Sequence, residues 1–164
     1  MSGISRQLSI TQNRKFYSMR ISSKGRYAIA ALIEMALDGT GEPITLASLA
    51  RRLDVSKVYL EQVFSLLKRA ELVLSIKGAQ GGYLLKDTPE QITLYAILSP
   101  IELHLSERTE KATEGMPSEM GDTIHQLVFE RLDDAILQTL TSVTLADLAA
   151  DVTRRRDGGN MYYI

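Results

Sequence analysis

The stretch TLASLARRLDVSKVYLEQVFSLL, residues 45–67, decides the fold of this chain of 164 residues. Its apolar residues recur at intervals of three and four in two short runs, which predicts two amphipathic helices. Thr45 and Ser56 precede the runs, and both residue types cap helix N-termini. Two short helices joined by a tight turn at residues 54–56 are the core of a helix-turn-helix, although any helical hairpin also fits this spacing. The residues predicted to be buried are Leu46, Leu49, Ala50, Leu53, Leu60, Val63, Phe64 and Leu67.

A β-hairpin is predicted directly after the helix pair. Residues 72–77 and 82–86 have the composition of strands, and the tip between them is Gly78-Ala79-Gln80-Gly81. A hairpin in this place is the wing of a winged helix-turn-helix, and Lys77 puts a cation beside its tip. In such a head the second helix of the pair enters the major groove of DNA. The predicted fold class is therefore mainly α with a small β-hairpin wing.

Further segments flank this predicted head on both sides. Residues 24–37 are apolar on nearly all sides, which predicts a helix buried from more than one direction. Residues 92–98 predict a short helix that Pro100 interrupts, and residues 106–121 are polar and predict a mobile loop. Residues 1–18 are polar and without periodicity, which predicts a disordered leader; a basic arm reaching into a DNA minor groove is the alternative.

A long amphipathic helix is predicted over residues 122–140. It would span about 29 Å, more than the small head can cover, so its apolar stripe needs a partner surface. A second copy of the chain is the simplest partner, and a core helix of a larger monomer is the alternative. A last helix is predicted from Thr144 to the arginines at 154–156, followed by a flexible joint at 157–160 and an apolar tail. The predicted stripe of the long helix consists of Ile124, Leu127, Val128, Leu132, Ala135, Ile136 and Leu140.

The net charge of -1 hides a strong polarity along the chain. Residues 1–86 hold 13 Lys and Arg against 6 Asp and Glu, whereas residues 87–164 hold 6 against 14. A polyanion such as DNA would be attracted to the first half and repelled by the second. The alternative is that two oppositely charged faces simply attract each other.

Several classes of protein are excluded or disfavoured by what the chain lacks. It contains no cysteine, which excludes disulfides, cysteine nucleophiles and thiolate metal sites. His104 and His125 are the only histidines and do not make a metal site by themselves. No catalytic triad, carboxylate pair or phosphate loop is recognisable, so an enzyme is not expected. No apolar run approaches the roughly 18 residues of a membrane span, and the first 18 lack a signal-peptide core. A cytoplasmic protein without a cofactor is expected.

Three stretches resemble the signature motifs of the Rrf-two family of bacterial winged-helix transcription regulators. They are MRISSKGRY at residues 19–27, VYLEQV at 58–63 and GAQGGY at 78–83, and the match extends over residues 19–164. The resemblance implies a winged helix-turn-helix head, a long C-terminal helix that crosses its partner in a homodimer, and sequence-specific binding to double-stranded DNA. The implied organisation is a disordered leader (1–18), a DNA-binding domain (19–90), a short helix with a mobile loop (91–121), dimerisation helices (122–156), and a joint with an apolar tail (157–164).

The family motifs also imply a DNA-binding site. On the recognition helix, Gln62 can pair with an adenine edge and Glu61 can accept from a cytosine amine, so both are expected to read bases. Ser56 and Tyr59 can serve either bases or phosphates. The residues expected to contact phosphates or to form the wing, and so to set affinity more than sequence, are Arg20, Ser22, Lys24, Arg26, Tyr27, Arg51, Arg52, Lys57, Lys77, Gly78, Gln80 and Gly81.

The chain departs from the family pattern in three places. Lys77 stands where many relatives carry Arg, and a lysine lacks the bidentate fork of a guanidinium. Leu98-Ser99-Pro100 replaces the usual Glu-Gly-Pro ending of the helix after the wing. Relatives that sense through a cluster supply thiolates from the loop corresponding to residues 101–117, which has no cysteine here. A regulator without an iron–sulfur cluster is therefore expected.

The chain resembles the branch of the family that represses cysteine metabolism, because it lacks cluster-binding cysteines and ends in Met161-Tyr162-Tyr163-Ile164. That branch is controlled by a complex with cysteine synthase, whose active site accepts C-terminal peptides ending in isoleucine. The resemblance implies a repressor whose tail binds cysteine synthase, and a tail packed on its own dimer is the alternative. The alternative function is a protein-interaction adaptor that has kept the winged helix but no longer reads DNA.

Overall fold

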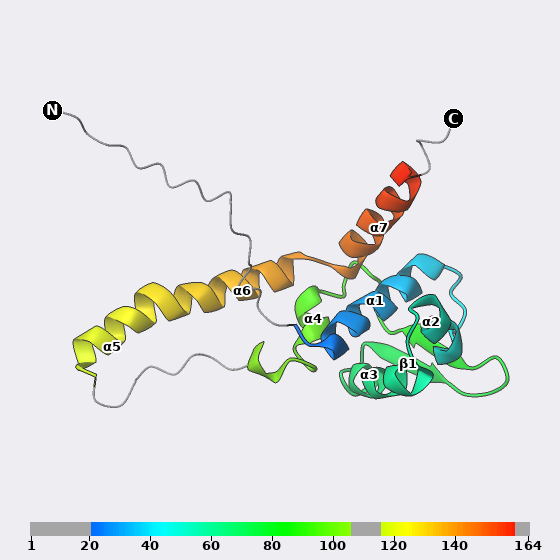
Figure 1. Cartoon of the computed structure of the whole chain (residues 1–164), viewed down its shortest axis with the longest axis horizontal. Helices are drawn as coiled ribbons and strands as arrows, with labels where there is room; N and C mark the ends of the chain where they lie inside the picture. Colours follow the sequence, from blue (N-terminus) through cyan, green and yellow to red (C-terminus); the bar gives the residue numbers. More distant parts are fainter. Residues whose placement is uncertain (1–20, 106–115, 160–164) are drawn as a thin grey trace.

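A long helical arm projects from a small head in the computed structural model, which describes residues 21–105 and 116–159 (Figure 1). The leader predicted at 1–18 and the tail at 161–164 lie outside the described residues, so both stay predictions. The head consists of α1 (Ser23–Asp38), α2 (Leu46–Arg52), α3 (Lys57–Arg69), β1 (Val73–Ile76), β2 (Gly82–Leu85) and α4 (Leu94–Leu98). A 3-10 turn η1 (Leu103–Leu105) follows, and the arm consists of α5 (Ser118–Ile124), the π turn η2 (His125–Phe129) and α6 (Glu130–Ser142), before α7 (Leu145–Gly159).

The predicted helix-turn-helix is confirmed, with its caps. The Thr45 side chain accepts a hydrogen bond from the Ser48 backbone N–H at 3.2 Å, and Ser56 accepts one from the Tyr59 N–H at 3.2 Å. These bonds satisfy backbone donors that a helix start leaves without partners. α3 packs on both α1 and α2, and α1 also packs on α4 and α7, so it is buried on more than one side as predicted. The predicted stripes are buried except Leu53, which is partly buried against the same core.

The predicted wing is an antiparallel pair of strands, shorter than expected at both ends. β1 and β2 pair in register from Val73 opposite Leu85 to Ile76 opposite Gly82. Ile44 forms an isolated β-bridge with Tyr83 of β2: the N–H and C=O of the two residues exchange hydrogen bonds of 2.9 and 2.8 Å. A Cβ at position 82 would lie 2.6 Å from the Ile44 carbonyl oxygen, so this close approach requires a glycine. The wing is thereby fastened to the segment that leads into α2.

The helix after the wing starts later than predicted. The sequence predicts a helix from Ile92, but α4 begins at Leu94 with Thr93 as its cap. Thr93 instead forms an isolated β-bridge with Thr144 just before α7, and the Ile92 C=O beside it accepts from the Leu145 N–H at 2.8 Å. Burial of Ile92 and Leu145 in the same core stabilises this extended pairing over another helical turn.

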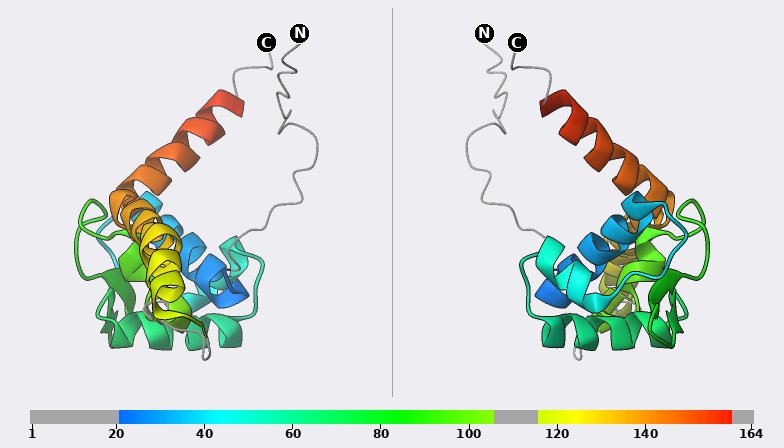
Figure 2. Two further views of the ribbon diagram at one scale, coloured as in Figure 1. Left: turned by 90° about the vertical axis from the view of Figure 1, so that its left-hand side faces the viewer. Right: turned by 90° about the vertical axis from the view of Figure 1, so that its right-hand side faces the viewer.

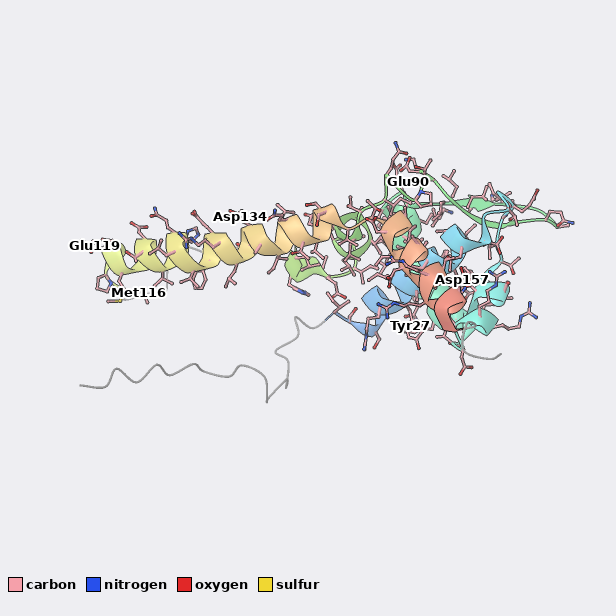
Figure 3. All side chains as sticks on the ribbon, turned by 90° about the horizontal axis from the view of Figure 1, so that it is seen from above. Tyr27, Glu90, Met116, Glu119, Asp134 and Asp157 are labelled. Atoms are coloured by element: carbon pink, nitrogen blue, oxygen red, sulfur yellow. The ribbon has the colours of Figure 1, made fainter. Side chains whose placement is uncertain are left out.

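The arm is continuous from Ser118 to Ser142 and begins four residues before the start predicted at 122. Its C-terminal end packs on α4 and buries Leu140, while the rest extends away from the head (Figure 1). Figure 3 shows the side chains between the labelled Glu119 and Asp134 standing clear of the head. The large apolar residues exposed along the arm, each 45–55% exposed, are Met120, Leu127, Val128, Leu132 and Leu137.

α7 packs on α1 and rises on the side of the head opposite α3 (Figures 1 and 2). Its predicted capping box is confirmed: the Asp147 carboxylate accepts from the backbone N–H and the hydroxyl of Thr144, and these bonds hold the pKa of Asp147 below its usual value. The helix runs on to Gly159, so residues 157–159 are helical where a flexible joint was predicted. Its last turn is held to α1 by a hydrogen bond from Arg156 to Glu34 at 2.8 Å. No helix in the described ranges combines the length and the apolar character that a bilayer crossing demands.

Candidate nucleic-acid interface

The outer face of α3 is the central surface of the candidate site. Leu60, Val63, Phe64 and Leu67 turn inward and are fully buried. Residues three and four positions apart lie on one face of a helix, so Val58, Glu61 and Gln62 share the outer face, and all three are exposed. Gln62 forms no hydrogen bond within the described part of the chain, which leaves its amide available to a base edge.

Val58 is a candidate contact that the sequence prediction missed. It stands in the first turn of α3 and is 64% exposed, which is unusual for a branched apolar side chain. An apolar side chain at this place in a recognition helix can contact the methyl group of thymine. The sequence does contain a signal for this residue: Val58 is apolar but lies outside the buried stripe of the predicted recognition helix, so it has no core to pack against.

Ser56 and Tyr59 are placed at the start of α3 in supporting positions. The Ser56 hydroxyl is occupied as the helix cap. The Tyr59 ring is partly buried and meets the edge of the Tyr27 ring, with the two centroids 5.4 Å apart. The Tyr59 hydroxyl is buried and has no hydrogen-bond partner among the described residues. The structure therefore brings Tyr27 and Tyr59 together as the contact between α1 and α3, and their roles on DNA stay predictions.

The predicted phosphate-binding residues fall into two groups. Lys24, Arg26 and Arg51 are exposed, and none of them has an ion pair within the described ranges. Lys57 lies 3.3 Å from Glu61 one turn later, an exposed pair that phosphates can replace at little cost. Arg20 lies outside the described residues.

Arg52 differs from the rest of the predicted cations because acidic residues of α1 already hold it. Its guanidinium donates to Asp38 at 2.9 Å and lies 3.6 Å from Glu34. The Thr40 hydroxyl and the Arg52 guanidinium together lower the pKa of Asp38 from its usual value. Arg156 reaches the same Glu34, so this cluster ties α2 and α7 to α1. These contacts tie the end of α2 to α1, and a phosphate contact by Arg52 stays a prediction.

The tip of the wing presents an exposed cation, Lys77, and exposed residues beside it. Lys77 is exposed, and so are Gly78 and Gln80. The backbone of Gly78 has a φ of 112°, which side-chain-bearing residues rarely adopt. At the base of the wing Lys86 donates to Glu71 at 2.7 Å, which raises the pKa of Lys86 and lowers that of Glu71. Lys77 is thus the cation of the wing that is left unpaired among the described residues.

An exposed recognition helix, a cationic wing and two exposed cations at the start of the first helix lie on one head. Together they define a winged helix-turn-helix transcription regulator that binds DNA. The chain belongs to the Rrf2 family, whose model, described as an iron-dependent transcriptional regulator, matches residues 21–151. It is 35% identical over 145 residues to the HTH-type transcriptional regulator IscR of Sodalis glossinidius (strain morsitans), covering 85% of this chain and 87% of that protein. The relatives are regulators of transcription and not enzymes.

Solved structures agree with this assignment. CymR of B. subtilis, described as its global cysteine regulator, superposes with a TM-score of 0.68 and 36% identity over 81% of this chain and 98% of that one. T. potens IscR superposes with a TM-score of 0.64 and 31% identity over 82% and 89% of the two chains. The predicted family and the predicted fold class are both confirmed.

The family description mentions iron, and the donor groups of this chain do not fit a thiolate-held cluster. The chain has no cysteine. His104 Nδ1 lies 4.0 Å from a carboxylate oxygen of Glu102, and His125 Nδ1 lies 3.2 Å from one of Glu130 without hydrogen-bond geometry. Within the described residues no group of three or more potential ligands is assembled around a common point. Iron–sulfur clusters in proteins are held mainly by cysteine thiolates, which this chain cannot supply.

Proposed function

We propose that the chain reads DNA through the outer face of α3, with Gln62 and Glu61 on base edges and Val58 against a thymine methyl. The observation that carries the proposal is the exposure of these three side chains on a helix whose opposite face is fully buried. Lys24, Arg26, Arg51 and Lys57, with Lys77 on the wing, then neutralise phosphates and set the register of the head on the duplex. Ser56, Tyr59 and Tyr27 hold the recognition helix at the angle this requires.

The working form is proposed to be a homodimer built on the arm. The apolar side chains exposed along α5, η2 and α6 form a surface that the head does not cover. A second copy offers the same surface, and a two-fold axis matches each patch with itself. The dimer presents two recognition helices, which favours an operator of two related half-sites.

A cluster-free repressor is the proposed mode of action. The absence of cysteine argues against thiolate-based sensing, and a dimer seated on a promoter blocks transcription without further chemistry. Control of cysteine metabolism is supported by the likeness to CymR, the global cysteine regulator of B. subtilis. The proposed place of action is the cytoplasm, where bacterial DNA is found.

We expect the affinity for duplex DNA to fall steeply with salt. A dimer that neutralises six or more phosphates should give a slope of log K against log salt concentration of about -5 or steeper. Fluorescence anisotropy with a duplex selected from a random pool measures this slope. Lys24→Ala should reduce its magnitude by about 1 to 2 in a dimer. Arg154→Ala should leave it unchanged, because Arg154 belongs to α7, the helix on the side of the head opposite α3. A protein-interaction adaptor would show weak binding without this dependence.

The C-terminal residues are proposed to receive the signal by binding cysteine synthase. Truncation by two residues, which removes Tyr163 and Ile164, should abolish capture of the protein by immobilised cysteine synthase, while the full chain is retained. Truncation should leave affinity for DNA in the absence of cysteine synthase within about twofold, since a change below ~0.5 kcal/mol is expected from a site remote from the bases. Equal capture of the two forms would contradict the proposal and favour a tail that packs on its own dimer.

A further inference from the structure

A buried carboxylate lies at the start of the first helix. In the part of the chain that the structure describes, Glu102 is the only charged or polar residue that is buried, with 5% of its surface exposed. Its Oε1 accepts a hydrogen bond from the backbone N–H of Ser22 at 2.8 Å. Ser22 is the cap of α1, and its own hydroxyl accepts from the Gly25 N–H at 3.1 Å. Two backbone donors of the helix start are therefore satisfied together, one by a residue 80 positions away.

The Glu102 carboxylate explains why a glycine stands at position 25, within the first family motif. A Cβ at position 25 would lie 2.5 Å from Glu102 Oε1 and 2.9 Å from Ile21 Cγ2, so a larger residue would displace the acid. Gly25 is buried in the first turn of α1, and glycine is a poorer helix former than alanine. Since a carboxylate near the positive end of a helix is favourable, the pairing of Gly25 with Glu102 compensates for that cost.

The position of this contact links two parts of the molecule. Lys24 and Arg26 lie in the first turn of α1, which Ser22 caps, and both are proposed to neutralise DNA phosphates. Glu102 lies four residues after the end of α4, and its backbone N–H donates to the Leu98 carbonyl at 2.8 Å. α4 packs on both α1 and α6, so the carboxylate follows the helix that joins the DNA-facing helix to the base of the arm.

We propose that Glu102 is a positioning residue for DNA binding: its buried carboxylate, seated against Gly25, holds the start of α1 where Lys24 and Arg26 meet phosphates. The inference rests on the proposed DNA-binding function. It assigns a role to a residue that touches no DNA, and it makes the orientation of the phosphate-binding residues depend on the segment that leads out of α4.

A mutant cycle tests this inference. Glu102→Ala should weaken binding to the selected duplex about tenfold, within the usual range of coupling between sites, and should reduce the salt slope, because Lys24 and Arg26 lose their register. Glu102→Gln should recover most of both quantities, since an amide oxygen still accepts from the Ser22 N–H. Gly25→Ala should resemble Glu102→Ala. The double variant should bind no more weakly than either single variant, because both substitutions break one contact. Glu90→Ala, which removes an exposed acid, is the matched control.

The readouts separate a positioning role from simple loss of stability. Affinity is scaled to the active fraction by stoichiometric titration, and the salt slope does not change when a fraction of the protein merely unfolds. Additive losses for Gly25→Ala and Glu102→Ala, or a Glu102→Ala variant with the original affinity and slope, would overturn the inference. If the unmodified protein lacked salt-dependent DNA binding, the proposed function itself would fail, and the contact between residues 25 and 102 would still be measurable as coupling in thermal unfolding.

Discussion

Leu132→Glu should convert the dimer into a monomer. Leu132 lies midway along the exposed apolar face of the arm and is 55% exposed in the single chain. In a two-fold interface the substitution introduces two carboxylates into the apolar contact, each of which must be desolvated without a partner. We expect the dissociation constant of the dimer to rise by about 100-fold or more, equivalent to ~2.7 kcal/mol. Sedimentation velocity over a concentration series measures it.

The matched control for this substitution is Gln138→Glu, which places the same residue on the same helix at an exposed polar position. It should leave the dimer intact, and both variants should keep the helical far-UV signal. Operator affinity should fall with the dimer in Leu132→Glu, because a monomer engages a single half-site. A Leu132→Glu protein that sediments as the unmodified protein does would show that this face does not hold the two copies together.

Gln62→Ala should relax the specificity of binding at one base position of each half-site. A bidentate contact between a glutamine amide and an adenine edge is worth about 1–3 kcal/mol of discrimination, so the preferred base should lose roughly tenfold or more per half-site. The salt slope should stay as in the unmodified protein, because Gln62 meets no phosphate in the proposed complex. Selection from a random duplex pool, followed by sequencing, shows which position loses its preference.

Gln91→Ala provides the comparison, since Gln91 is an exposed glutamine in the turn before α4. It should leave the selected motif unchanged. Lys24→Ala should behave differently from both glutamine variants, because it should weaken all duplexes alike and reduce the salt slope. A Gln62→Ala protein that selects the same motif as the unmodified protein would remove Gln62 from base readout.

The helices of the head could be predicted from the sequence because their signals are local. Thr45 and Ser56 cap α2 and α3 as predicted, and the spacing of Leu60, Val63 and Phe64 identifies the buried face of α3. The start of α4 could not be predicted in this way. Thr93 forms a β-bridge with Thr144, 51 positions later, and no local sequence pattern indicates such a pairing.

In the candidate site, too, some features follow from local sequence patterns and others depend on packing between elements. The exposure of Glu61 and Gln62 follows from helical periodicity and was predictable. The pairing of Arg52 with Asp38 and the seat of Glu102 against Gly25 depend on how separate helices meet. The sequence alone therefore does not show that Arg52 on α2 is paired with acids of α1, or that Glu102 is buried. Packing between helices determines both the pairing of Arg52 and the burial of Glu102, and one sequence alone does not show which helices pack together.

The π turn in the arm has a consequence for the shape of its apolar surface. Met120, Ile124, Val128, Leu132 and Ile136 are spaced by four. In a regular α-helix each step of four residues overshoots a full turn by about 40°, so such a row would wind around the rod. The wider turn at His125–Phe129 rotates the chain less per residue and takes back part of that drift. The row therefore winds around the arm less steeply than on a regular α-helix, which keeps more of its side chains on one side.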